Sequence, residues 1–187
     1  MITLKPFEPA DMDRLIGWID SPEFLLQWAG PIFTYPLDKA QLEQHCKQVD
    51  QSNPPSLLIF KAVDSRNDVV GHIELSHIDY LNLSASISRV LVAPNKRGQG
   101  LGEHMMIQML RIAFDQLHLH RIDLRVFDFN AGAIACYEKV GFIKEGLIRD
   151  ARKMGESYWS LYQYSLLEHE WRQKNNPRSS SVKQNHS

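Results

Sequence analysis

The chain has 187 residues, of which 43% are hydrophobic and 23% are charged. This length suits one domain with a sizeable core, and the composition excludes a globally disordered chain. Lysine and arginine total 21 and aspartate and glutamate total 22, which gives a net charge of −1. Broad, non-specific binding to nucleic acid depends on neutralising phosphates, so a near-neutral chain disfavours it, although a local basic patch is not excluded. No specific nucleic-acid partner is predicted.

Neither export nor membrane insertion has a sequence signal. The longest apolar runs, such as residues 57–60, are far shorter than the roughly 18 residues that a membrane span needs. The N-terminus has no basic segment followed by an apolar one. Cys46 and Cys136 are too few for a disulfide framework, and His118 and His120 have no third ligand at a metal-binding spacing. We therefore expect a cytoplasmic protein with no membrane partner and no metal.

Apolar periodicity predicts strands and helices over the first half of the chain. The expected order is a strand at 2–7, a helix at 10–19 that Asp11 caps, an aromatic-rich loop with a short helix at 20–37, a polar helix at 38–51, and strands at 56–63, 69–78 and 83–92. A polar turn separates the strands at 56–63 and 69–78, which predicts a hairpin.

The second half begins with a loop at 93–100 and then alternates helix and strand. The expected elements are helices at 101–117 and 131–140 and strands at 121–127, 142–148 and 157–166. From 172 to 187 there are four basic residues, no acidic ones and one large apolar residue, Val182. We expect one mixed α/β domain over residues 1–171 and a disordered polar tail over residues 172–187.

The segment with the clearest chemistry is V-A-P-N-K-R-G-Q-G-L-G, at residues 92–102. Glycines between a strand and a long helix let the backbone approach a ligand, and the N–H groups and dipole of a helix N-terminus favour phosphate. Arg97 can hold phosphate through two hydrogen bonds. The alternative is a turn that only links strand to helix. A dinucleotide fingerprint fails because its third glycine falls on Glu103 or Met105, and the Gly-Lys-Ser/Thr of a nucleotide P-loop does not occur.

This pattern, V-x-P-x-x-R-G-x-G-x-G, resembles the acetyl-CoA signature of the GNAT superfamily of N-acetyltransferases. A second motif, N-x-x-A-x-x-x-Y-x-K-x-G-F at residues 130–142, is similar to another element of that family. Glu145, Gly146 and Arg149 extend the resemblance to the branch that includes ribosomal-protein N-terminal acetyltransferases. The resemblance covers about residues 1–171. It implies an α/β (α+β) fold with a single mixed, mostly antiparallel twisted sheet, a splayed central strand pair and flanking helices.

The resemblance also implies acetyl-CoA as co-substrate. In this family the arginine and the glycine loop hold the pyrophosphate, and the splayed strand pairs with the pantetheine arm. A backbone N–H near Leu91 and Val92 could stabilise the oxyanion of a tetrahedral intermediate. The residues that the resemblance assigns to acetyl-CoA are Val90, Leu91, Val92, Arg97, Gly98, Gln99, Gly100, Leu101, Gly102, Asn130 and Tyr137.

Two of these residues have specific roles under the resemblance. Tyr137 corresponds to a tyrosine beside the CoA sulfur, where a phenol can protonate the departing thiolate or position the sulfur. The alternative is a core aromatic residue. Asn130 would bond the pantetheine arm, and it also suits the N-cap of the following helix, two roles that can hold at once.

The acceptor side is less specified. An amine must lose a proton before it attacks, and Glu74, on the strand beside the splayed one, is the candidate base, with His72 and His77 as weaker candidates. The alternative is a solvated carboxylate on a strand face. The resemblance places Trp28 and Tyr35 in the loop that forms the acceptor wall, and Ser86 and Arg89 are further candidates for substrate binding. Core packing is the alternative for the two aromatic residues, and Arg89 either contacts an acidic group of the acceptor or reaches solvent.

The sequence therefore predicts an enzyme that moves an acetyl group from acetyl-CoA to a primary amine by direct attack in a ternary complex. The acceptor is either a protein N-terminus or a small-molecule amine. A non-catalytic acyl-CoA-binding or sensing module on the same fold is the main alternative, and a nucleotide-dependent enzyme is a third. The chain could be a monomer or a homodimer.

Overall fold

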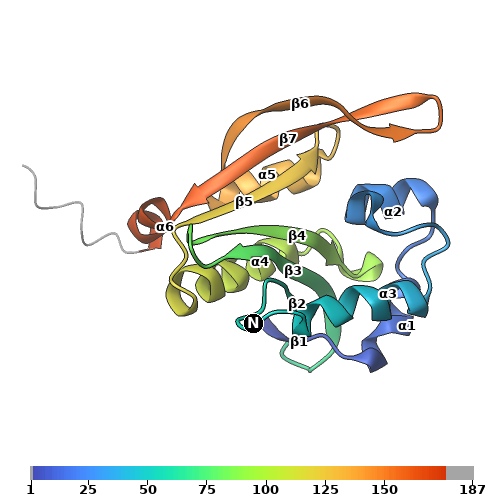
Figure 1. The fold of residues 1–187 in the computed structure, drawn as a ribbon, viewed down its shortest axis with the longest axis horizontal. Helices are drawn as coiled ribbons and strands as arrows, with labels where there is room; N and C mark the ends of the chain where they lie inside the picture. Colours follow the sequence, from blue (N-terminus) through green and yellow to red (C-terminus); the bar gives the residue numbers. More distant parts are fainter. Residues whose placement is uncertain (1, 176–187) are drawn as a thin grey trace, which may run out of the picture.

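A computed structural model describes residues 2–175 of the chain. The elements in chain order are β1 (Thr3–Pro6), α1 (Met12–Ile16), α2 (Pro22–Ala29), α3 (Lys39–Cys46), β2 (Leu58–Val63), β3 (Val69–Asp79), β4 (Ser84–Val92), α4 (Leu101–Leu110), β5 (Arg121–Phe127), α5 (Ala131–Val140), β6 (Ile143–Met154), β7 (Ser157–Leu167) and α6 (Glu168–Asn175). The strands form one seven-stranded sheet in the order β1-β2-β3-β4-β5-β7-β6, and every neighbouring pair is antiparallel except β4 and β5 (Figure 1). The predicted mixed sheet is therefore confirmed.

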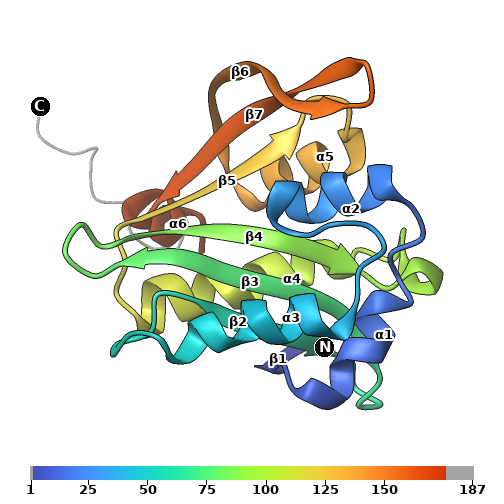
Figure 2. The same cartoon turned by 45° about the vertical axis from the view of Figure 1, so that its right-hand side comes forward.

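Helices cover both faces of this sheet (Figure 2). On one face α4 and α5 bury the larger core, which includes Ile73, Leu75 and the methionines of α4. On the other face α1, α2 and α3 pack into a second cluster that includes Trp28 and Leu91. Because side chains alternate along a strand, β3 sends Ile73 and Leu75 to the first face and its polar residues to the second.

The parallel strands β4 and β5 separate soon after they meet. Their register joins Ser84 to Arg121, Ala85 to Ile122 and Ser86 to Asp123, and in residues 2–175 no further pair follows. Both strands continue beyond this point and diverge, as the ribbon shows (Figure 1), so the edge of β4 beyond Ser86 is not paired with β5; this space is hereafter the β4–β5 cleft. The splayed central pair predicted from the sequence is thus present.

Several element boundaries differ from the prediction. Helix α1 is short, and Asp11 does not cap it with its side chain. Instead Asp11 is buried and accepts hydrogen bonds from Lys61 and Arg14. The helix predicted at 101–117 ends its regular α-form at Leu110 and continues as a π-helical turn.

At the C-terminus the fold extends past the predicted boundary at residue 171. Helix α6 continues to Asn175, four residues past that boundary. Its Trp171 is 5% exposed and packs into the larger core. The rest of the predicted tail, residues 176–187, lies outside the described residues. None of the helices in the described part is long and apolar enough to cross a membrane.

Candidate functional site

The cleft between β4 and β5 exposes backbone groups of β4. The N–H of Ala93 donates to the carbonyl of Val70 at 2.9 Å, and the next pair in the ladder is Val92 opposite Gly71. Antiparallel ladders alternate bonded and non-bonded pairs, so the N–H and carbonyl of Val92 point away from β3 and into the cleft. Of the two predicted positions for a backbone donor, Val92 therefore faces the cleft, and Leu91 pairs with β3.

The glycine loop lies at the end of the same strand. Gly98 and Gly100 have φ angles of 76° and 73°, in the left-handed region that favours glycine, and a Cβ added to either would meet no atom within 4 Å. Gly100 is the N-cap of α4, so the first backbone N–H groups of the helix, from Leu101 to Glu103, have no intrahelical partner. The loop thus offers free donors and open space, which suits an anionic ligand.

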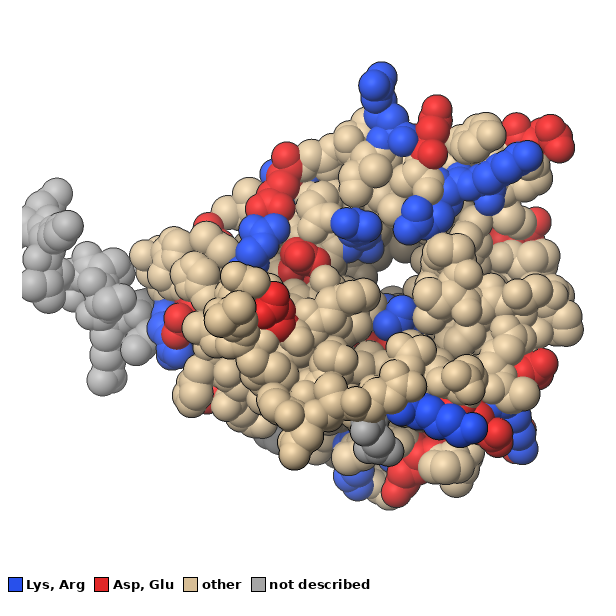
Figure 3. Space-filling model, viewed as in Figure 1, with Lys and Arg blue, Asp and Glu red and all other residues tan. Residues whose placement is uncertain are grey.

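Arg97 lies beside this loop and is exposed. Its Nε donates to the carbonyl oxygen of Val92 at 3.4 Å, and its guanidinium carbon lies 5.1 Å from the centre of the Phe24 ring of α2. These contacts are long and solvent-accessible, so the guanidinium can turn to a phosphate at small cost. Figure 3 shows an opening in the surface between the β6–β7 hairpin and α2, with Lys and Arg side chains along its upper rim.

Asn130 occupies the N-cap of α5. Its Oδ1 accepts a hydrogen bond from the N–H of Ala133 at 3.3 Å, so the capping role holds. In residues 2–175 its side-chain amide nitrogen donates no hydrogen bond, and the predicted bond to the pantetheine arm stays a prediction.

Tyr137 lies on α5 and is 9% exposed. Burial raises the pKa of its phenol well above the usual value of 10, so the phenol keeps its proton at neutral pH. In the described residues its hydroxyl has no hydrogen-bond partner within the chain, yet it is not among the polar atoms sealed from solvent. A protonated and unengaged phenol can donate to a ligand atom. Burial also raises the pKa of the adjacent Cys136 thiol to about 11, which disfavours a nucleophilic thiolate.

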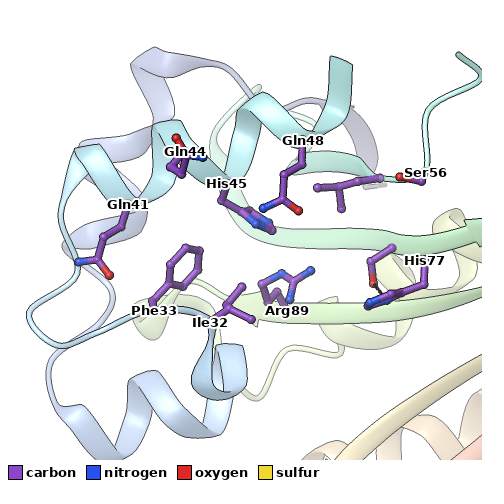
Figure 4. A pocket seen from close by; sticks show the side chains of 11 residues that line it. Ile32, Phe33, Gln41, Gln44, His45, Gln48, Ser56, His77 and Arg89 are labelled. Atoms are coloured by element: carbon purple, nitrogen blue, oxygen red, sulfur yellow. Dashed lines mark hydrogen bonds between the residues drawn. The ribbon is translucent and has the colours of Figure 1, made fainter. Parts of the chain in front are cut away.

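A pocket of about 260 Å³ opens on the face of the sheet that α1, α2 and α3 cover, between α3 and strands β3 and β4. Figure 4 shows His45 of α3 and Arg89 of β4 pointing toward each other across it. The lining residues are Ile32, Phe33, Gln41, Gln44, His45, Gln48, Ser56, Leu57, Ser76, His77 and Arg89. Gln41 is occupied by three hydrogen bonds with Thr34 and Pro36, which hold the wall formed by residues 32–36 in place.

Beneath the pocket, the carboxylate of Glu74 is 1% exposed and fully engaged. One oxygen accepts from His72 Nε2 at 2.9 Å, and the other accepts from His45 Nε2 at 2.9 Å and Arg89 Nε at 2.6 Å. Burial alone would raise the pKa of Glu74, but the two histidine hydrogen bonds and the Arg89 charge outweigh it and hold that pKa far below 4.5. The carboxylate is therefore ionised and a poor proton acceptor.

A β-bulge aims Arg89 at this carboxylate. The register passes from His72 opposite Leu91 to Glu74 opposite Ser88, so both Arg89 and Val90 face the single residue Ile73. Arg89 has a φ of 50°, a conformation that costs a non-glycine residue about 1–3 kcal/mol and persists only where its surroundings enforce it. Bulges commonly re-aim side chains next to functional sites. This bulge turns Arg89 to the face of the sheet that carries the pocket.

Comparison with known proteins identifies the family. The family model described as "Acetyltransferase (GNAT) family" matches residues 22–142. The chain belongs to the GNAT acetyltransferase family. This confirms the resemblance seen in the glycine-loop and Asn130–Phe142 motifs.

Several relatives of this GNAT chain are similar in sequence. Spermidine N(1)-acetyltransferase of Vibrio cholerae is 33% identical over 87 residues, 46% of this chain and 50% of that protein. An uncharacterized N-acetyltransferase of Bacillus licheniformis, p20, is 28% identical over 173 residues, 91% of this chain and 94% of that protein. A Bacillus subtilis protein provisionally described as a ribosomal N-acetyltransferase, YdaF, is 31% identical over 101 residues, 54% of this chain and 55% of that protein. This chain therefore aligns with only about half the length of the spermidine and ribosomal enzymes.

Solved structures agree on the fold. The structure of spermidine N-acetyltransferase from Vibrio cholerae in complex with CoA and spermine superposes with a TM-score of 0.79 at 24% identity, covering 91% of this chain and 97% of that one. At this identity the likeness establishes the GNAT fold of the chain.

The structure separates the residues predicted at the acceptor side of this GNAT chain. Arg89 lines the pocket, its Nε donates to Glu74, and its side chain is 10% exposed at the pocket wall. Trp28 is 8% exposed and packs against the rings of Phe33 and His72, so core packing describes it. Tyr35 is exposed.

The hydroxyl groups of two further predicted acceptor residues, Tyr35 and Ser86, form hydrogen bonds elsewhere in the GNAT fold. The hydroxyl of Tyr35 donates to the carbonyl of Asp20 at 3.2 Å. Ser86 donates to Asp123 at 2.6 Å, at the point where β4 and β5 part. None of Trp28, Tyr35 and Ser86 lines the pocket. The alternative offered for Glu74, a solvated carboxylate, is wrong because the side chain is buried.

Sequence reasoning missed His45. It is 8% exposed on α3, which had been expected to be a polar helix. His45 lies three positions after Leu42 and one before Cys46, so it shares the inward face of the helix with them. A polar residue among the apolar positions of a helix was the signal that could have revealed it.

Proposed function

We propose that this chain transfers the acetyl group of acetyl-CoA to a primary amine held in the pocket beside α3. The observation that carries this proposal is that one strand, β4, forms a wall of both sites. Its Val92 faces the β4–β5 cleft, and Arg89, three residues earlier, lines the pocket. A thioester lying along the cleft and an amine in the pocket would thus meet at the end of the same strand.

Acetyl-CoA suits the cleft on chemical grounds. The diphosphate carries negative charge, and the loop at Gly98 to Gly102 presents unpaired N–H groups, positive helix-dipole potential and the nearby guanidinium of Arg97. The free backbone edge of β4 can pair with the amide groups of the pantetheine arm. In this proposal the loop and Arg97 hold the phosphates, and β4 with Asn130 holds the arm.

The proposed reaction is direct transfer in a ternary complex. The amine nitrogen attacks the thioester carbon, and the carbonyl electrons move to oxygen, where the backbone N–H of Val92 stabilises the negative charge. The carbon–sulfur bond then breaks, and the thiolate takes a proton from the Tyr137 hydroxyl. The amine gives up a proton in the same sequence, so the products are an acetamide and the CoA thiol.

His45 replaces Glu74 as the proposed proton acceptor. Its Nε2 is bound to the ionised carboxylate of Glu74 and must donate, so the neutral ring leaves Nδ1 with a free lone pair. His45 lines the pocket, within reach of an acceptor amine. His72 is bound to the same carboxylate but is 2% exposed and does not line the pocket. Glu74 thus acts as a positioning residue that fixes the ring of His45.

The relatives support an amine acceptor and leave its kind to experiment. The names of two relatives point to spermidine and to a ribosomal protein, a small amine and a protein N-terminus respectively. A non-catalytic CoA-binding role is the other class considered. The presence of both Tyr137 and His45 favours catalysis, because simple binding requires neither a proton donor nor a proton acceptor.

The test is acetyl-CoA-dependent thiol release with a panel of primary amines, with the acetylated product identified by mass. We expect release with at least one amine and about a hundredfold lower kcat in His45→Gln, since general base catalysis typically contributes 10²–10⁴-fold. Glutamine keeps a donor for Glu74 but cannot accept the proton. Raising the pH toward the pKa of the amine, about 8 for a protein N-terminus and about 10 for a lysine-like amine, should restore part of the loss. Acetyl-CoA binding without thiol release for any amine would instead support the sensing module.

A further inference from the structure

The pocket beside α3 has an unusual charge balance for a site that receives amines. In the described part of the chain none of its lining residues is an aspartate or a glutamate. Its polar lining consists of amides and serines together with His45, His77 and Arg89. The exposed carboxylate of Glu43, on α3, lies outside the lining. An ammonium group entering this pocket would meet no exposed carboxylate.

The carboxylate of Glu74 does not serve as a binding group for an ammonium in the pocket. It is buried, and three donors from His45, His72 and Arg89 already occupy both of its oxygens. The side chain is 1% exposed, so an ammonium in the pocket has little access to the remaining lone pair. The negative charge of Glu74 is therefore compensated by donors of the protein itself.

Arg89 keeps donors available for a ligand. Only its Nε is bound to Glu74, and in residues 2–175 its terminal nitrogens Nη1 and Nη2 have no hydrogen-bond partner. Neither terminal nitrogen is among the sealed polar atoms, and the side chain is 10% exposed at the pocket wall. A guanidinium anchored through Nε and open at both Nη positions can form the parallel pair of hydrogen bonds that a carboxylate accepts.

We propose that the acceptor is a small primary amine that also carries a carboxylate, as in an amino acid, and that Arg89 binds this carboxylate. The proposal rests on the acetyl-transfer function above and specifies its acceptor. The pocket volume of about 260 Å³ suits such a small molecule, since sites for drug-sized ligands span roughly 300–1,000 Å³. A polyamine, with several positive charges and no carboxylate, would instead face the guanidinium. An acidic residue near the N-terminus of a peptide is a second source of the same chemistry.

The first experiment compares acceptors on the full-length wild-type protein. Thiol release at saturating acetyl-CoA is measured with the protein amino acids, each beside its amide and its decarboxylated amine, and with spermidine, spermine and short peptides bearing an acidic second residue. We expect kcat/KM for the best amino acid to exceed that of its amide by about tenfold or more, the usual range for hydrogen bonds to a charged partner. A higher kcat/KM for the acidic peptides than for any free amino acid would identify a peptide as the source of the carboxylate.

The second experiment tests the residue. In Arg89→Gln the ratio of kcat/KM for acid over amide should fall about tenfold or more, and Arg89→Lys should lie between, because lysine keeps the charge but cannot form the paired bonds. Arg125→Gln removes an exposed arginine of β5 outside the pocket and should leave the ratio unchanged. Melting curves check that each variant is folded, and the wild-type comparison remains decisive if one is not.

The outcomes separate the two proposals. Release with amides or polyamines at rates equal to or above those of every carboxylate-bearing amine would overturn the carboxylate proposal while acetyl transfer stands. An acid-to-amide ratio that is unchanged in both Arg89 variants would overturn the role of Arg89. No release with any amine, despite acetyl-CoA binding, would overturn the acetyl-transfer function and the acceptor proposal together.

Discussion

Replacing Glu74 by glutamine should lower the stability of the protein by about 3–5 kcal/mol, the usual effect of removing one partner of a buried ion pair. Glu74 is 1% exposed, and the variant would leave Arg89, whose side chain is only 10% exposed, without its counter-charge. For a domain of this size, this loss corresponds to a fall in melting temperature of roughly 6–20 °C. A calorimetric or circular-dichroism melting curve measures it.

Glu145→Gln is the matched control. Glu145 also binds an arginine, Arg121, through two hydrogen bonds, but both side chains are about one-third exposed, at 38% and 33%. Exposed pairs contribute about 0–1 kcal/mol, so the control should melt within roughly 4 °C of wild type. Equal losses in the two variants would contradict the central position given to Glu74.

Acid should remove the difference between Glu74→Gln and wild type. The native-state pKa of Glu74 lies below its usual value of 4.5, so its contribution to stability is complete above pH 4.5 and declines as the pH falls below that value. The gap in melting temperature should therefore be constant from pH 5 upward and narrow in more acidic buffer. A gap that widened in acid would mean that the native pKa is raised.

Tyr137→Phe should lower kcat by about a hundredfold or more while changing the affinity for acetyl-CoA less than threefold. A phenol that protonates the leaving thiolate acts in the transition state, and general acid catalysis typically contributes 10²–10⁴-fold. Its pKa is raised by burial, so it should stay protonated through neutral and mildly alkaline pH. Single-turnover rates and calorimetric titration with acetyl-CoA separate the two effects.

Tyr164→Phe provides the control for that loss. Tyr164 is fully buried on β7 and its hydroxyl donates to Glu138 at 2.8 Å, away from the pocket lining. Its removal should cost stability, about 1 kcal/mol for one hydrogen bond, with kcat nearly unchanged. If Tyr137→Phe kept wild-type kcat, or if both variants lost it equally, the tyrosine would be a packing residue.

The parts of the fold that the sequence predicted well have strong local signals. The strand at 121–127 and the helix at 131–140 were predicted with the bounds that β5 and α5 have. Alternating apolar residues set the first, and Asn130 and Gly141 mark the two ends of the second. The glycine loop was found for the same reason, because its φ angles require glycine at fixed positions.

The acceptor pocket depends on contacts between distant segments, which leave no local pattern. Glu74 was predicted as the base, with a solvated carboxylate as the alternative, because nothing in the local sequence shows that His45 of α3 lies over it. The bulge at Arg89 lies in a run of ordinary strand residues with no glycine to reveal a positive φ. The extension of α6 beyond residue 171 was hidden by its polar composition, since only Trp171 reaches the core.

The central claim is that the β4–β5 cleft and the glycine loop bind acetyl-CoA. The most direct measurement is the melting temperature of the full-length protein with acetyl-CoA, NADH or GTP at matched concentrations. A ligand at 100 times its Kd stabilises by about 2.7 kcal/mol, which for this chain is a rise of roughly 5–11 °C. We expect that rise with acetyl-CoA alone, and a much smaller one in Arg97→Glu, where like charge faces the phosphates. No rise at saturating acetyl-CoA, or an equal rise with NADH or GTP, would contradict the account.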